Sequence, residues 1–149
     1  VLSKQNKYDE AIAKYEEALK LEPNNMNIYV SLVFSLLMQN KFEEAIAKSK
    51  EALTIDQGNA MIYANLGNAL SMLNKYDEAI TKYKKALELE SKNAMIYVGL
   101  GEILLKHGKY DEAITRYNQA HELEPKNNQV TALGNKLSQY HEETERTKN

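Results

Sequence analysis

The three histidines are the side chains best suited to proton transfer or metal binding near neutral pH. None of them pairs with a second histidine or a carboxylate in a way that suggests a metal site. His107 and His121 stand near the ends of predicted helices, and His141 lies beside Glu142 and Glu145 in a polar tail that we expect to fray. We therefore predict no catalytic residue, no metal site and no enzymatic activity.

Other devices for chemistry are missing from the sequence. The 149 residues include no cysteine, which excludes thiol catalysis and favours a reducing compartment such as the cytoplasm. No glycine-rich phosphate loop or Gly-x-Ser-x-Gly elbow occurs, so we expect no cofactor. The 19 Lys and Arg nearly balance the 21 Asp and Glu, which argues against a nucleic-acid partner. The longest uncharged apolar stretch, Ile28 to Gln39, is shorter than the roughly 20 residues of a membrane-spanning helix, so we expect no membrane insertion.

A six-residue motif, Lys-Tyr/Phe-Asp/Glu-Glu-Ala-Ile, recurs every 34 residues. Its copies begin at Lys7, Lys41, Lys75 and Lys109. Apolar residues within each period follow helical spacing, so each unit is predicted to form two amphipathic helices. A fixed period of this length indicates a tandem array of helix pairs.

The residues between the predicted helices support this division. One set, at the junction within a pair, consists of types that accept the left-handed conformation: Asn6, Asn40, Asn74 and Gly108. A second set stands where the next pair begins, and each member can accept a hydrogen bond from a free helical N–H: Asn25, Asn59, Asn93 and Asn127.

The sequence resembles the tetratricopeptide repeat, a 34-residue helix-turn-helix, because aromatic residues, small residues and alanines recur at fixed positions of each unit. The aromatic of the first helix is Tyr29, Tyr63 or Tyr97, and a Leu-Gly pair follows it at Leu66-Gly67 and Leu100-Gly101. The second helix carries two alanines with an aromatic between them, as in Ala79, Tyr83 and Ala86. The resemblance implies an all-α fold, a right-handed superhelical solenoid of antiparallel helix pairs with a C-terminal capping helix.

The same register predicts the organisation of the chain. Because Val1 enters a unit late in its first helix, we expect a fragment or a processed chain that begins with a truncated repeat, mainly its second helix. The expected segments are this truncated repeat at 1–25, complete repeats at 26–59, 60–93 and 94–127, and a capping helix with a frayed tail at 128–149. The repeat 26–59 departs from the pattern, since Val33 replaces the small residue and Ser49 replaces the second-helix aromatic.

In the resemblance, a concave groove is lined by the first helix of each repeat. Carried onto this sequence, the groove residues are Val30, Phe34, Leu37, Met38, Met61, Ala64, Asn68, Met72, Met95, Val98, Glu102 and Leu105. The segment from Tyr29 to Met38 is apolar nearly all round, and such a helix must have both faces covered. The cover is either a partner or the inner wall of the array itself.

We predict a protein–protein interaction adaptor whose groove binds an apolar or amphipathic segment of a partner, most readily a helix. One alternative is a co-chaperone module that holds an acidic C-terminal tail. Its cations would stand at Val30, Ala64 and Val98, and of the groove positions only Asn68 matches. Another alternative is a self-assembling array, which would make the chain a homo-oligomer.

Overall fold

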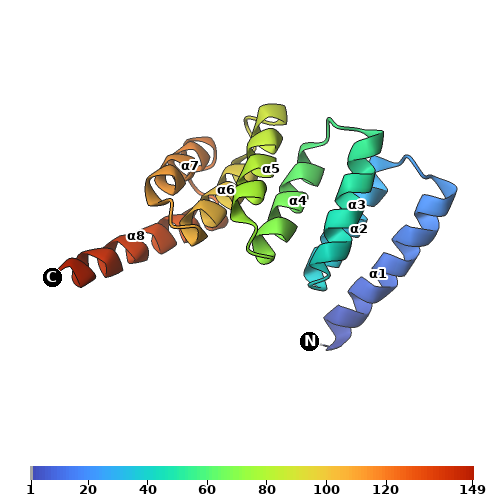
Figure 1. The fold of residues 1–149 in the computed structure, drawn as a ribbon, viewed down its shortest axis with the longest axis horizontal. Coiled ribbons are helices and arrows are strands. Elements are labelled where there is room, and N and C mark those ends of the chain that lie inside the picture. Colours follow the sequence, from blue (N-terminus) through green and yellow to red (C-terminus); the bar gives the residue numbers. More distant parts are fainter. Residues whose placement is uncertain (1) are drawn as a thin grey trace. The chain divides into compact units, whose positions relative to one another are not determined.

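A computed structural model describes residues 2–149, and Val1, where the predicted truncated repeat begins, lies outside them. The described residues form eight α-helices and no strand (Figure 1). The helices are α1 (Leu2–Leu21), α2 (Met26–Met38), α3 (Phe42–Ile55), α4 (Ala60–Met72), α5 (Tyr76–Leu89), α6 (Ala94–Lys106), α7 (Tyr110–Leu123) and α8 (Asn128–Lys148). They belong to two compact units that divide between Leu89 and Glu90. The predicted all-α class is confirmed.

The first unit contains α1 to α5. Here α2 packs against α1, α3 and α4, and α4 forms a closely packed pair with α5. The chain reverses between the members of each pair, so the helices of a pair run antiparallel (Figure 1). Its core consists of large side chains on the inward stripes of α2 and α4, among them Leu32, Leu36, Ile62 and Leu66.

The second unit contains α6, α7 and α8. The pair of α6 and α7 is closed by α8, which contacts both helices. Leu100 and Leu104 of α6 are buried, as are Val130 and Leu133 of α8. The α8 helix therefore packs as the first helix of a next repeat would, as the capping prediction requires.

Asparagine side chains begin four of the helices. The Oδ1 atoms of Asn25 and Asn93 accept hydrogen bonds of 3.0 Å from the backbone N–H two residues on, and Asn127 accepts one of 2.8 Å. Asn59 accepts one of 3.1 Å from Ile62 N–H. Each cap satisfies an N–H that has no partner within its helix. The predicted caps are confirmed.

Three of the four predicted junction residues are left-handed. Asn40 has φ 58°, Asn74 has φ 60° and Gly108 has φ 78°. The prediction for Asn6 is wrong, because this residue lies inside the continuous helix α1. The backbone from Leu2 onward continues through Asn6 as one helix, and the helical hydrogen bonds satisfy its polar groups without a turn.

The C-terminal helix also differs from the prediction. It runs to Lys148, past the segment from Glu142 for which the sequence predicts fraying. The Tyr140 ring stacks on Tyr110 with centroids 5.1 Å apart, and Lys148 pairs with Glu145 at 3.2 Å one turn earlier. Contacts of both kinds stabilise helical residues.

Tyr29 links the two helices of its repeat and gives a pH-dependent prediction. Its hydroxyl donates to Glu51 Oε1 at 3.0 Å, and only 3% of the residue is exposed. Burial, then the hydrogen bond to Glu51 and the charge of that carboxylate, raise the pKa of Tyr29 above its usual 10.0. The folded state thus holds this proton more tightly than the unfolded state does. We expect the stability from Tyr29 to be complete below about pH 10 and to be lost as the pH rises through the folded pKa.

Urea unfolding between pH 8 and 11 tests this. Tyr29→Phe should lower the free energy of unfolding by about 1 kcal/mol at pH 8, because one hydrogen bond is lost. The variant should also lose stability less steeply above pH 10 than the parent chain. Equal slopes for the two proteins would contradict the assignment, and Tyr76→Phe, on a half-buried tyrosine of α5, provides a control.

Candidate functional site

Four large apolar side chains of the first unit stand exposed on the first helices of adjacent repeats. Phe34 is 48% exposed and Met38 47% on α2, while Met61 is 40% and Met72 50% exposed on α4. We call these four residues the apolar face. All four are among the groove residues that the sequence predicts.

A cavity of about 450 Å³ lies at the α1 end of this face. Val30 and Phe34 of α2 and Met61 of α4 line it, and α1 adds Tyr8 and Tyr15. The lining also includes Lys7, Ala11, Ser31, Ser35 and Asn65. The cavity therefore offers aromatic and aliphatic walls with a few hydrogen-bonding groups at its edge, which is the usual composition of a binding site for an apolar group.

The α1 residues of this cavity are absent from the sequence prediction. Tyr8, Ala11 and Tyr15 occupy positions where the second helix of a repeat packs on its first helix. In the part of the chain that the structure describes, these three side chains form the α1 wall of the cavity. The register of Ala11, Tyr15 and Ala18 was the signal that could have identified them.

Three predicted groove residues are buried and offer no surface. Leu37 is 8% exposed, Ala64 5% and Val98 3%. Leu37 belongs to the core cluster that α1 to α4 form, and it lies one helical turn from the buried Val33. Ala64 is too short to reach past its larger neighbours. For these three positions the structure corrects the prediction.

The Asn68 side chain is hydrogen-bonded within its own repeat. Its Oδ1 accepts a hydrogen bond from the hydroxyl of Tyr83, which joins α4 to α5. A ligand that used this amide oxygen would compete with an internal hydrogen bond. Asn68 is therefore better suited to holding the helix pair together than to binding a partner.

The predicted groove residues of the second unit meet α8 and the segment before it. Glu102 pairs with Lys136 of α8 at 3.5 Å, and Met95 Sδ lies 3.8 Å from Nδ2 of Asn127. Leu105 is half-buried. The second unit thus covers part of this surface with its own residues.

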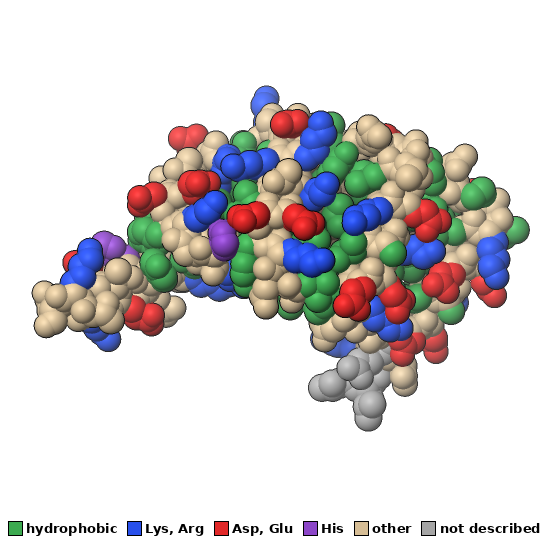
Figure 2. All heavy atoms as spheres, viewed as in Figure 1, with side chains coloured by type: hydrophobic (Ala, Val, Ile, Leu, Met, Phe, Trp, Pro, Cys, Tyr) green, Lys and Arg blue, Asp and Glu red, His purple; other side chains and the backbone are tan. Residues whose placement is uncertain are grey.

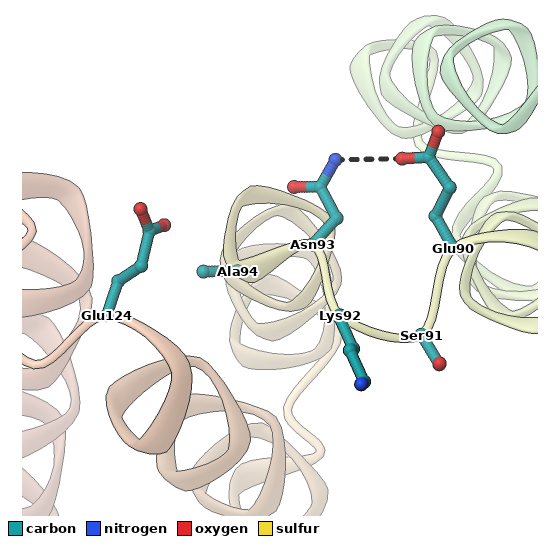
Figure 3. A pocket seen from close by; sticks show the side chains of 6 residues that line it. All are labelled: Glu90, Ser91, Lys92, Asn93, Ala94 and Glu124. Atoms are coloured by element: carbon teal, nitrogen blue, oxygen red, sulfur yellow. Dashed lines mark hydrogen bonds between the residues drawn. The ribbon is translucent and has the colours of Figure 1, made fainter.

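A second cavity, of about 580 Å³, lies where the second unit begins (Figure 3). It is lined by Glu90, Ser91, Lys92, Asn93 and Ala94, with Glu124 from the end of α7 across from them. Asn93 Nδ2 donates to Glu90 Oε2 at 3.0 Å, while Asn93 Oδ1 caps α6. Both polar atoms of the Asn93 side chain therefore already have partners within the chain.

Two of the three histidines contact tyrosine rings. His121 lies 5.8 Å from the Tyr117 ring and His141 lies 6.1 Å from Tyr110, centroid to centroid. Within residues 2–149 no three His, Asp or Glu side chains come together as metal ligands would. In the same part of the chain, no helix combines the length and apolar character needed to cross a bilayer. Charges of both signs are interspersed over the visible surface of each unit (Figure 2).

The chain consists of helix pairs that recur every 34 residues. This arrangement places it in the class of helical-repeat proteins. Sequence profiles for the TPR repeat match residues 1–33, 35–74 and 68–108, and one for the tetratricopeptide repeat matches residues 94–127. The chain belongs to the tetratricopeptide repeat family. Members of this family generally act as non-enzymatic scaffolds for protein–protein interactions. No curated protein sequence matches the chain.

Solved structures with the same fold include three of different background. A crystal structure of MamA protein aligns with 24% identity over 94% of this chain and 82% of that one, with a TM-score of 0.72. TTC0263, a thermophilic TPR protein of Thermus thermophilus, aligns with 22% identity over 91% and 74%, with a TM-score of 0.80. The first TPR domain of Spaghetti (RPAP3), bound to the HSP90 peptide SRMEEVD, aligns with 26% identity over 76% and 90%, with a TM-score of 0.70.

Proposed function

We propose that the chain is an adaptor whose apolar face, together with the adjoining cavity, binds an apolar or amphipathic helix of a partner protein. The observation that carries this proposal is the exposure of Phe34, Met38, Met61 and Met72 on adjacent first helices, beside a cavity with apolar walls. Exposed apolar surface of this kind costs free energy in water and favours a partner. Methionine side chains adapt to ligands of different shape.

The chemistry of the face favours an apolar ligand over an acidic one. The positions that would hold clamp cations carry Val30 and Ala64 in the first unit, and Asn68 is engaged by Tyr83. Without a cation, the desolvation of a ligand carboxylate is not offset. The acidic peptide held by the Spaghetti (RPAP3) domain therefore supports peptide binding by this fold, and not the same ligand for this chain.

The expected affinity is modest. Full burial of four such side chains stabilises a complex by roughly 6–12 kcal/mol. About half of each side chain is already covered in the free protein. The binding free energy that the four side chains can still contribute is therefore about 3–6 kcal/mol. Association costs of about 4–15 kcal/mol oppose it. A helix that also reached into the cavity would add contacts, and we expect dissociation constants no tighter than micromolar.

Charge substitution on the apolar face tests the function. We expect Phe34→Asp combined with Met72→Asp to reduce partner capture from a cell lysate at least about tenfold, since a carboxylate placed against an apolar ligand must be desolvated. Quantitative mass spectrometry of the captured proteins gives the measurement. A matched control is Ile55→Asp combined with Leu89→Asp, two exposed apolar residues at the ends of α3 and α5. The proposal fails if the folded face variant captures the same proteins as the control.

A further inference from the structure

The two helices that carry the apolar face contain no charged residue. Helices α2 and α4 are each 13 residues long, and their sequences hold no Asp, Glu, Lys, Arg or His. At the chain's charged fraction of 27%, about seven charged residues would be expected in the two helices together. The corresponding helix of the second unit, α6, carries Glu102 and Lys106. The helices of the apolar face therefore offer no charge that could attract an opposite charge of a ligand or reject a like one.

Two polar side chains beside the apolar face are hydrogen-bonded within the chain. Beside Phe34, the hydroxyl of Ser35 donates to the carbonyl oxygen of Ser31 at 3.0 Å. Beside Met72, the hydroxyl of Ser71 donates to the backbone carbonyl three residues earlier at 2.9 Å. Neither hydroxyl therefore depends on a ligand for a hydrogen-bond partner.

Three of the four residues of the apolar face are methionines, at positions 38, 61 and 72. A methionine side chain has three rotatable bonds and a polarisable sulfur, so it fits ligand side chains of different shape. In a rigid apolar pocket, one methylene group of a ligand changes the affinity by roughly 10- to 200-fold. A methionine-rich surface that re-packs around each ligand discriminates much less between them.

We propose that the apolar face holds apolar helical segments of many different proteins and selects them for their apolar stripe rather than for their sequence. A single cognate partner is normally selected through charges or unpaired polar groups, and the helices of this face offer no charge. The occupant is a segment that an unfolded or newly made protein exposes, because such segments share an apolar surface and no common charge pattern. Binding them keeps them from associating with one another, as a chaperone does. This inference rests on the proposed function and specifies its class of partner.

Fluorescence anisotropy with labelled peptides measures the selectivity. Four peptides of alanine and glutamine, each about 16 residues long so that a helix can form, carry the same apolar stripe. The stripe is filled with leucine, isoleucine, methionine or phenylalanine. We expect the four dissociation constants to lie within about fivefold of one another, and to change less than about twofold between about 50 and about 500 mM NaCl. A fifth peptide with asparagine in the stripe should bind at least about twentyfold more weakly.

The outcomes of this titration separate the inference from the function on which it rests. If one peptide binds at least about twentyfold more tightly than the other three, the face is selective, and the inference is wrong although the adaptor function stands. If none of the four binds, the inference is also wrong. The lysate capture experiment with Phe34→Asp and Met72→Asp then decides the adaptor function by itself.

Stiffer side chains on the apolar face should narrow its range of ligands. In the triple variant Met38→Ile, Met61→Ile and Met72→Ile, the branched side chains have fewer rotamers and re-pack less around each ligand. The four dissociation constants should then spread over at least about twentyfold, while the tightest stays within about threefold of the parent value. Met95→Ile, the same change on an exposed methionine of the second unit, is the control and should leave the spread unchanged. An unchanged spread in the folded triple variant would overturn the mechanism.

Protection of an unfolded protein gives a functional measurement. Lysozyme unfolds and aggregates when dithiothreitol reduces its disulfides, and the chain itself has no cysteine on which the reductant could act. An excess of the parent chain should lower the light scattered by reduced lysozyme at least about threefold. The variant with Phe34→Asp and Met72→Asp should give almost no protection, and its control with Ile55→Asp and Leu89→Asp should protect as the parent chain does. Equal protection by the two variants, or none by the parent chain, would reject the proposal.

Discussion

Replacing Gly67 with valine should lower the free energy of unfolding by about 3 kcal/mol. A Cβ atom at this position would lie 2.5 Å from Cδ2 of Tyr83 and 3.1 Å from the carbonyl oxygen of Ala79. The ring cannot move aside easily, because Tyr83 is 2% exposed and its hydroxyl donates to Asn68. The two helices would have to separate. Urea unfolding followed by circular dichroism measures the loss.

Two further variants show whether the Tyr83 ring causes the loss. Gly101→Val should cost less, about 1 kcal/mol, because its nearest neighbour is the flexible methyl end of Leu133 at 2.8 Å and the next atoms lie at 3.7 Å. Tyr83→Ser in the Gly67→Val background should recover much of the lost stability, since it removes the ring. If the serine variant recovers nothing, the clash assigned to the ring is wrong.

The sequence predicts the fold well because its signals are local. A 34-residue period, asparagine caps and left-handed junction residues each depend on a few neighbouring residues, and the repeats present them several times. The caps at Asn25, Asn59, Asn93 and Asn127 are accordingly confirmed, as is the all-α class. Asn6 shows the limit of a local signal: it has the right residue type and register, but its backbone continues helix α1.

The candidate site is less predictable because exposure depends on neighbours. Helical spacing places Leu37 and Ala64 on the groove side, yet both are buried by residues that the spacing does not weigh. Phe34 and Met72 are exposed as the groove prediction requires. The α1 wall of the cavity is invisible to a search for groove residues, because Tyr8 and Tyr15 occupy packing positions. The role of all these residues in binding stays a prediction.

The two departures of the repeat 26–59 from the family pattern, Val33 and Ser49, are explained by a comparison with the next repeat. Val33 stands where the next repeat has Gly67, and Ser49 stands where it has Tyr83. Both are completely buried, and Ser49 Oγ donates to the carbonyl of Ala45 at 2.8 Å. In the repeat 60–93, the Tyr83 ring of the second helix fills the space beside Gly67. In the repeat 26–59, Val33 of the first helix fills the corresponding space beside Ser49. Each departure compensates the other.

We therefore expect Val33→Gly and Ser49→Tyr to be strongly coupled. Val33→Gly alone should cost about 3–4 kcal/mol of unfolding free energy, through lost burial, a cavity and a helical glycine. Ser49→Tyr alone should cost about 3 kcal/mol through overpacking. The double variant should cost about 2 kcal/mol less than the sum, because the ring enters the space that valine leaves. A full urea-unfolding cycle gives the coupling.

The comparison with Tyr83 also predicts what the double variant still lacks. Phe34 occupies the place of Asn68, so the hydroxyl that Ser49→Tyr introduces would find no amide acceptor there and would lose about 1 kcal/mol. Adding Phe34→Asn should regain it. As a control, Ser49→Tyr combined with Leu100→Ala, a core residue of the other unit, should be additive within about 0.5 kcal/mol. Additivity of the Val33 and Ser49 changes as well would show that the two residues do not share one space.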